Sequence, residues 1–175
     1  MNIAVFLDTN NLYHSVRRKF GQEQKINYSA LLEQIDTLGD VVHREAFGIQ
    51  INRQSSRFIA YLRYHGFEPF YYNMDIQDSS KMRIPRIHMP MRMSIHLYNY
   101  LINNPSEADT VMIGTADPTF KFAIPAIKEM GFRIVVIGVG IPTDLGEEAH
   151  EVIELDETYL EKPQAVETEA EVESN

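Results

Sequence analysis

The segment Ile3-Ala4-Val5-Phe6-Leu7-Asp8-Thr9-Asn10-Asn11 predicts the class of fold. Its five consecutive apolar residues are typical of a strand that is buried on both faces of a parallel sheet. The segment Thr110-Val111-Met112-Ile113-Gly114-Thr115-Ala116-Asp117 has the same organisation. Because ligands of such sheets bind outside the carboxyl ends of the strands, Asp8 and Asp117 are predicted to lie at one shared rim.

The two aspartates suggest a cation site, and each also has a structural explanation. If their strands are neighbours, the carboxylates can converge on a divalent cation, which takes hard, anionic oxygen ligands. Aspartate and asparagine are also frequent at strand-to-helix turns and as helix N-caps. The occurrence of two such strand ends favours the cation site over a role for either aspartate alone.

Strand-like and helix-like segments alternate along the whole chain. This order predicts a doubly wound α/β domain, because successive parallel strands need right-handed helical crossovers. The central sheet is expected to be mainly parallel, with five or six strands flanked by helices. The expected strands are residues 3–7, 41–49, 67–72, 110–113, 132–139 and a short edge strand at 152–155; the expected helices are residues 10–20, 28–38, 53–65, 91–102 and 118–130, with a loop containing Pro85 and Pro90 before the fourth.

No glycine-rich nucleotide-binding motif follows the first strand. A Rossmann fingerprint needs Gly-x-Gly-x-x-Gly at that point, and a phosphate-binding loop needs Gly-Lys-Ser or Gly-Lys-Thr. Neither occurs in the sequence. The fragment Gly138-Val139-Gly140 is interpreted as a turn after the fifth strand.

The composition indicates a single domain that stays inside the cell. With 175 residues and 44% hydrophobic content, the chain can fill one core, and we expect the domain at residues 1–155. No apolar run approaches the roughly 18 to 20 residues of a membrane span, and no signal-type segment precedes the first strand. The absence of cysteine excludes disulfides and thiolate sites. We therefore expect a cytoplasmic protein with no membrane partner.

The net charge of −9 is unevenly distributed. Residues 156–175 contain seven acidic residues and one lysine, and the part from Pro163 onward has no aromatic residue. Such a segment cannot bury enough surface to offset its chain entropy, so we expect an acidic tail that is disordered at least from about residue 163. It is interpreted as a solubilising tail; the alternative is a nucleic-acid mimic that covers an empty basic groove.

A positively charged stretch lies in the middle of the chain, where residues 79–106 contain no acidic residue. Lysine and arginine that neutralise phosphates supply most of the non-specific affinity for nucleic acids, and nearby Tyr98 and Tyr100 could stack on bases. A solvated basic face is the alternative interpretation. The candidate nucleic-acid-binding residues are Lys81, Arg83, Arg86 and Arg92, together with Arg17 and Arg18 on the polar face of the first helix.

The two strand-end motifs resemble those of a known family. Residues 5–12, with Asp8 followed three residues later by Asn11, look like the opening of the NYN branch of the PIN-like nucleases. Residues 112–120 are similar to the late Ser-Gly-Asp-x-Asp-Phe stretch of that family, and the resemblance extends over about residues 1–155. It implies a metal-dependent ribonuclease-like domain that acts on RNA, with single-stranded RNA favoured. By resemblance, the catalytic residues are Asp8, Asn11 and Asp117, with Asp8 and Asp117 as ligands of Mg²⁺ or Mn²⁺.

The sequence departs from the family pattern at two acidic positions. The second aspartate of the late motif is replaced by Thr119, and the helix expected at residues 91–102 has no carboxylate, with Ser94 at the aligned position. The loss of carboxylates weakens the binding of a divalent ion, because each lost carboxylate removes both a ligand and a negative charge. Possible substitutes are the carboxylates Asp75, Asp78, Asp144, Glu147 and Glu148, which are more simply interpreted as solvated, and His96, which could bind Mn²⁺.

Two functions therefore remain open. The first is a metal-assisted phosphodiesterase of weak or specialised activity, in which Asn11 orients a ligand or phosphate and water attacks in line. The second is a non-catalytic module that binds RNA or a protein, a second copy of the chain included. A nucleotide-sensing regulatory domain is a more distant alternative. The missing acids favour the second function, and the retained Asp8, Asn11 and Asp117 favour the first.

Overall fold

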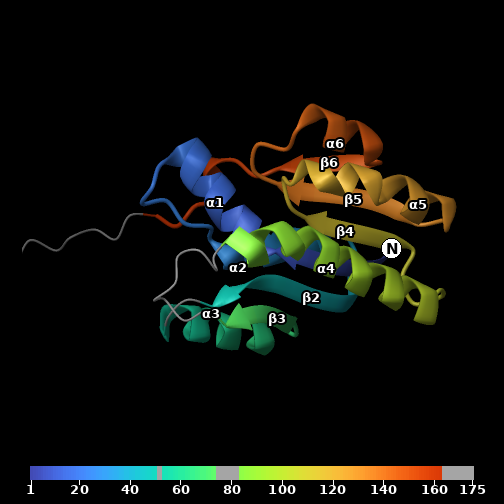
Figure 1. The fold of residues 1–175 in the computed structure, drawn as a ribbon, viewed down its shortest axis with the longest axis horizontal. Coiled ribbons are helices and arrows are strands. Elements are labelled where there is room, and N and C mark those ends of the chain that lie inside the picture. The colour runs from blue at the N-terminus through green and yellow to red at the C-terminus, as the bar shows by residue number, and fades with distance from the viewer. Residues whose placement is uncertain (51–52, 74–82, 163–175) are drawn as a thin grey trace, which may run out of the picture.

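One central sheet of parallel strands forms the middle of the molecule (Figure 1). The computed structural model describes residues 1–50, 53–73 and 83–162. The strands are β1 (Asn2–Asp8), β2 (Asp40–Gln50), β3 (Glu68–Asn73), β4 (Thr110–Gly114), β5 (Arg133–Gly138) and β6 (Glu151–Glu154). Their order is β3-β2-β1-β4-β5-β6. The doubly wound α/β fold predicted from the sequence is thus confirmed, with six strands.

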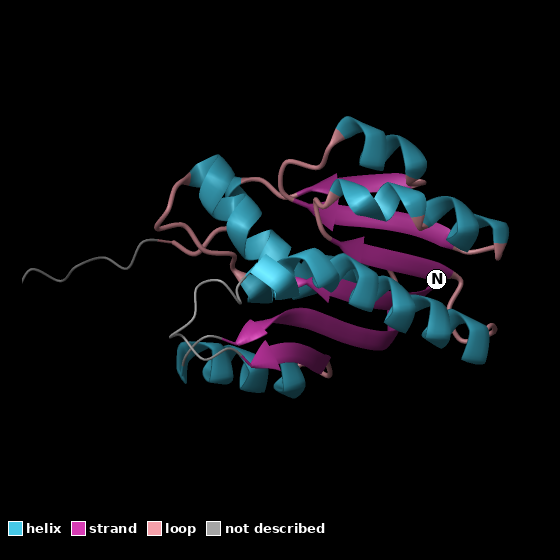
Figure 2. Ribbon diagram, in the orientation of Figure 1, coloured by secondary structure: helices cyan, strands magenta, loops and turns pink. Residues whose placement is uncertain are grey.

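Helices cover both faces of the sheet (Figure 2). The helices of one face are α1 (Thr9–Phe20), α2 (Tyr28–Leu38) and α3 (Arg53–Tyr64). The other face is covered by α4 (Arg83–Asn103), the 3₁₀ helix η2 (Pro118–Phe122), α5 (Ile124–Glu129) and α6 (Thr143–Glu148). A last 3₁₀ turn, η3 (Glu157–Tyr159), follows β6.

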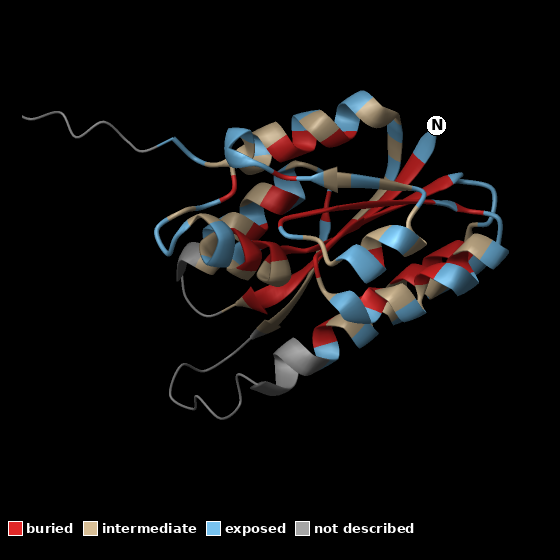
Figure 3. Cartoon of the chain, turned by 90° about the horizontal axis from the view of Figure 1, so that it is seen from above, coloured by how far each residue is buried: buried red, intermediate tan, exposed pale blue. Residues whose placement is uncertain are grey.

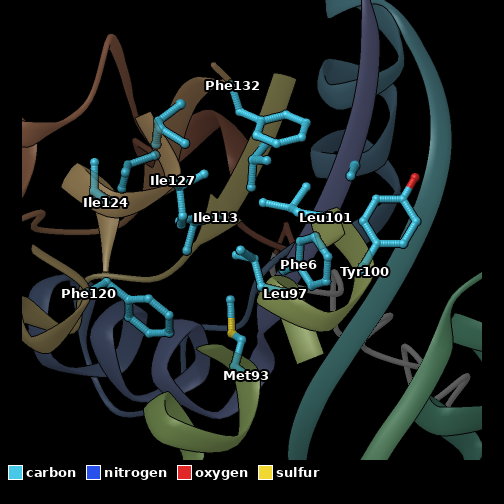
Figure 4. Packing of buried hydrophobic residues seen from close by; sticks show 14 of the residues in the cluster. Phe6, Met93, Leu97, Tyr100, Leu101, Ile113, Phe120, Ile124, Ile127 and Phe132 are labelled. Carbon is cyan, nitrogen blue, oxygen red and sulfur yellow. The ribbon is translucent and has the colours of Figure 1, made fainter. Parts of the chain in front are cut away.

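The side chains of β1 alternate between two hydrophobic cores, as expected for a strand that is buried on both faces. Ile3, Val5 and Leu7 pack beneath α1, α2 and α3. Ala4 and Phe6 pack on the opposite side. Figure 4 shows Phe6 and Ile113 of the sheet against Met93 and Leu97 of α4. The sheet is therefore rigidly held from both sides, and its strand ends are well positioned to carry a site.

Helix α4 is longer than the sequence pattern suggested. Residues 83–90 were expected to form a loop because of their two prolines, but α4 begins at Arg83 and contains Pro90. Proline is tolerated in the first turn, where Pro85 lies, because the amide there has no partner within the helix. Pro90 removes one interior hydrogen bond, but the adjacent Met89 and the nearby Met93 are fully buried against the sheet. Their burial offsets the cost of the proline.

The remaining differences concern the carboxyl-terminal half. The single helix expected at residues 118–130 is divided into η2 and α5, and α6 forms in a segment for which no helix was predicted. Residues just beyond β6 return to the body of the domain, where Leu160 forms an antiparallel bridge with Ile26.

The predicted disordered tail from residue 163 lies outside the described residues, as do Asp75, Asp78 and Lys81. Within the described part of the chain, no helix is long and apolar enough to cross a membrane.

Candidate active site at the carboxyl ends of the central strands

Asp8 and Asp117 follow neighbouring strands at the same edge of the sheet. In the register of β1 with β4, Leu7 is paired with Gly114, so Asp8 lies directly beside the segment that leads to Asp117. The strand order reverses between β1 and β4, and such switch points are where doubly wound sheets bind ligands. The predicted common rim for the two aspartates is therefore present.

Asp8 ends β1 and caps α1. Its Oδ1 accepts a hydrogen bond from the amide of Asn11 at 2.8 Å, and the side chain is only 3% exposed. The pKa of Asp8 is raised from 3.8 to about 7, chiefly by burial and also by the negative charge of Asp117, although the hydrogen bonds from the amides of Asn11 and Asn10 lower it. A buried carboxyl group beside a second carboxylate tends to bind a proton or a cation, because either one offsets the negative charge.

Asp117 is held by the turn that begins η2. Its Oδ1 accepts from the backbone N–H of Thr119 at 2.9 Å and from the Thr119 hydroxyl at 2.5 Å. The amide of Asp117 donates to the buried Thr115 hydroxyl at 3.1 Å. Thr119, where the resemblance led us to expect an aspartate, thus fixes the orientation of Asp117. Within the described part of the chain, Oδ2 of Asp117 has no hydrogen-bond partner and can meet a ligand.

Asn11 joins the two aspartate segments. Its backbone amide donates to Asp8, and its side-chain Oδ1 accepts from the amide of Ala116 at 2.8 Å. The hydroxyl of Ser15 is 3.5 Å from the same oxygen. Because its oxygen is used within the protein, Asn11 positions the residue before Asp117 relative to Asp8. Its Nδ2 is the group that remains to donate to a ligand.

Two tyrosines from distant parts of the chain lie near Asp8, and no motif in the sequence predicted them. The hydroxyl of Thr9 donates to the Phe47 carbonyl at 2.7 Å and forms a 2.6 Å hydrogen bond with the hydroxyl of Tyr71. Tyr28 is also close, since burial and the nearby Tyr71 and Asp8 raise its pKa. No periodicity or motif connects these residues, so sequence alone offered no signal for them.

Among the residues that the structure describes, the other proposed metal ligands do not join Asp8 and Asp117. His96 lies on α4 with its Nδ1 3.2 Å from the buried Glu45, and its ring packs on Phe70 with centroids 4.1 Å apart. Asp144 forms a 2.5 Å ion pair with Lys121. Ser94 is half-buried on α4. Over residues 1–50, 53–73 and 83–162, no group of three or more His, Cys, Asp or Glu could hold a metal ion.

Two carboxylates nevertheless fit a magnesium-type site. Mg²⁺ commonly uses one or two protein carboxylates and completes its octahedron with waters and substrate phosphate oxygens. The buried Asp8, whose pKa is raised towards neutrality, and the free oxygen of Asp117 match that donor set. The protein itself would supply less charge than a site with three or four acids.

Only part of the predicted basic face can be located. The Arg92 guanidinium lies 4.8 Å from the ring centroid of Tyr72 and 5.6 Å from that of Phe70, and it is partly exposed. Arg18 donates to Ser15 at 3.1 Å, and Arg17 contacts the ring and the hydroxyl of Tyr13. The side chains of Arg83 and Arg86 lie outside the described set, although both residues belong to α4. Tyr100 is buried and unavailable for base stacking.

The sheet order and the paired strand-end aspartates are features of a PIN-like, nuclease-type domain. The model of the NYN domain matches residues 2–156, and the chain belongs to this family. A crystal structure of VPA0982, a protein of unknown function from Vibrio parahaemolyticus, is similar with a TM-score of 0.74 and 20% identity, covering 91% of this chain and 96% of the other. That similarity shows the fold alone. The comparison with curated proteins found no match.

Proposed function

We propose that this NYN domain is a metal-dependent RNA phosphodiesterase of low or specialised activity, with Asp8 and Asp117 as ligands of Mg²⁺ or Mn²⁺. NYN domains are generally RNA-acting, and PIN-like nucleases generally use divalent metals. The observation that supports the proposal best is the link through Asn11, which bonds to Asp8 and to the amide of Ala116. This link holds the two carboxylates at one rim of the sheet.

The residues of the site have distinct roles in this proposal. A bound divalent cation would neutralise phosphate charge and activate water. Asp8 contributes an anionic ligand from a water-poor position, where a bound cation must displace the proton that the carboxyl group holds up to about pH 7. Thr119 keeps one oxygen of Asp117 occupied and leaves the other for the ligand. Asn11 keeps the two segments together and can donate from Nδ2 to a phosphate.

A non-catalytic RNA- or protein-binding module is the second candidate. The observation that favours it is the bonding of Thr119, which donates to Asp117 where the family pattern has another carboxylate. A hydroxyl in that position stabilises the scaffold without adding a charge for the metal. The two candidates differ in whether the remaining pair of carboxylates supports hydrolysis.

We expect the wild-type domain to cleave single-stranded RNA slowly with millimolar Mn²⁺ and more slowly with Mg²⁺. Mg²⁺ dehydrates reluctantly and demands a nearly ideal octahedron, so a site with few ligands favours Mn²⁺. Asp117→Asn should reduce the rate at least about 100-fold, since a lost metal ligand removes several kcal/mol of transition-state stabilisation. Cleavage of a fluorescent RNA by freshly purified protein measures both rates. An undiminished rate in Asp117→Asn would assign any activity to another site or to a contaminant.

Restoring carboxylates separates the two candidates. Thr119→Asp and Ser94→Asp, made singly and together, should increase cleavage and lower the metal concentration needed for half-maximal activity. Thr143→Asp, at the exposed start of α6, is the control for added charge. An inactive wild type that gains activity in the double variant would identify a binding module that kept the scaffold. An inactive wild type and an inactive double variant would reject the enzyme altogether.

The predicted basic face should contribute to RNA affinity. Replacing Lys81, Arg83, Arg86 and Arg92 together by alanine is expected to weaken binding of single-stranded RNA. It should also make the slope of log affinity against log salt shallower by about 0.7 per lost phosphate contact. Fluorescence anisotropy at several salt concentrations measures this. The control variant removes the same number of positive charges elsewhere, by alanine at Lys25, Arg63, Lys128 and Arg133. An equal loss of RNA affinity in both variants would show that net charge alone causes the effect.

A further inference from the structure

Helix α4 has a second apolar face that points away from the sheet. On the face of α4 that packs against the sheet, Met89, Met93 and Leu97 are buried. On the opposite side, Met91 is 61% exposed, Ile95 53% and Ile102 64%, and Tyr98 lies partly buried between them. In Figure 3 exposed and buried residues alternate around α4, and in Figure 1 the helix crosses in front of the sheet. A helix that is apolar on both sides is normally covered on both.

These four residues form a stripe that suits a helical partner. Met91, Ile95, Tyr98 and Ile102 are separated by four, three and four positions, the spacing of a seam between two packed helices. The hydroxyl of Tyr98 donates to the carbonyl of Ala123 at 2.9 Å, which ties the stripe to the end of η2. Phe122, the last residue of η2, is a further exposed apolar residue, at 77%. Contiguous apolar patches of about 300–600 Å² often mark functional surfaces.

We infer that this stripe is the interface of a homodimer in which α4 of one copy packs antiparallel against α4 of a second copy. The spacing of four, three and four reads the same in both directions along the helix. A two-fold axis near the middle of α4 therefore brings Met91 opposite Ile102 of the second copy, and Ile95 opposite Tyr98 of the second copy. Two-fold dimers require such a self-complementary surface.

Charge favours the antiparallel arrangement. The described side chains of α4 include His88 and Arg92 in its amino-terminal half and no carboxylate. His96, in the other half, pairs with Glu45. Glu107, which accepts a hydrogen bond from the Tyr100 hydroxyl at 3.2 Å, follows the carboxyl end of the helix. Antiparallel packing brings each basic half towards Glu107 of the second copy and towards the negative end of its helix dipole. Parallel packing would place the two basic halves together. An interface built mainly from one helix stripe of each copy belongs among the small specific interfaces, so we expect a dissociation constant on the order of micromolar.

The first test is sedimentation velocity of the full chain from low to high micromolar concentration. The wild type should pass from monomer to dimer over this range. The pair Ile95→Glu and Ile102→Glu should raise the dissociation constant at least about tenfold, because it removes central apolar contacts and introduces charges. Tyr64→Glu replaces an 86% exposed apolar residue on α3, on the opposite face of the sheet, and should leave dimerisation unchanged. A wild type that stays monomeric throughout, whatever other protein it binds, would overturn the inference.

The second test reports the direction of packing and does not depend on the folding of the glutamate variants. Because the chain has no cysteine, single Met91→Cys and Ile102→Cys proteins each carry one thiol. Antiparallel packing predicts a disulfide between the two proteins when they are mixed, and little between two copies of Met91→Cys. Preferential self-linking of Met91→Cys would contradict the proposed dimer.

Discussion

Asp8→Asn is expected to make the metal-free domain more stable at pH 8 while it abolishes metal-dependent cleavage. The pKa of Asp8 is raised from 3.8 to about 7, so the folded state holds this proton more tightly than the unfolded state. The stability linked to the proton is complete below pH 3.8 and is lost as the pH rises through 7. At pH 8 the buried charge costs on the order of 2–4 kcal/mol, which asparagine avoids. Asparagine can still accept the hydrogen bond from the amide of Asn11.

Denaturant unfolding at pH 4 and pH 8 in the presence of a chelator measures this effect. The free energy of unfolding of Asp8→Asn should exceed that of the wild type clearly at pH 8 and only slightly at pH 4. Adding Mn²⁺ at pH 8 should stabilise the wild type and not the variant, because binding to the folded state adds to its stability. Asp40→Asn, at an exposed position that begins β2, is the control. A pH-independent difference between the wild type and Asp8→Asn would contradict this description of the site.

Gly48→Ala should destabilise the domain by about 1–3 kcal/mol or more, the usual cost of overpacking a core. A Cβ at Gly48 would overlap the ring of Tyr71 and lie 2.7 Å from the hydroxyl of Thr9. Thr9 directly follows Asp8 and bonds to both Tyr71 and the Phe47 carbonyl. The substitution should therefore lower the melting temperature and also reduce metal binding at Asp8. Thermal unfolding and a Mn²⁺ titration measure the two effects.

A second substitution can test the cause of this loss. Tyr71→Ala removes the ring that collides with the new methyl group, so Gly48→Ala should cost much less in that background than in the wild type. Gly146→Ala is a matched control, because the nearest neighbour of its Cβ would be Val152 at 3.4 Å, an ordinary contact. If Gly48→Ala costs the same with and without Tyr71, the Tyr71 ring is not the cause, and the close approach to the Thr9 hydroxyl at 2.7 Å remains as the source of the strain.

The sequence alone determined the sheet and the location of the two aspartates. Unbroken apolar runs such as residues 3–7 are typical of strands that are buried on both faces of a parallel sheet, and here they predicted strands correctly. A polar residue directly after such a run must lie at the carboxyl rim, and this placed Asp8 and Asp117 correctly. The family motifs lie within these same local segments. Helix α4 was only partly predicted. Its two prolines are typical of a loop, whereas the burial of Met89 and Met93 stabilises a helix there.

Tertiary structure alone decided how the site is held together. The hydrogen bond from Ala116 to Asn11 joins residues 105 positions apart, and the bond between Thr9 and Tyr71 spans 62 positions. Such contacts depend on strand order and side-chain direction, which leave no local pattern in the sequence. The raised pKa of Asp8 has the same origin, because it results from burial by the surrounding elements and from the charge of Asp117. Local sequence specified which groups reach the rim, and long-range packing determined their environment and their partners.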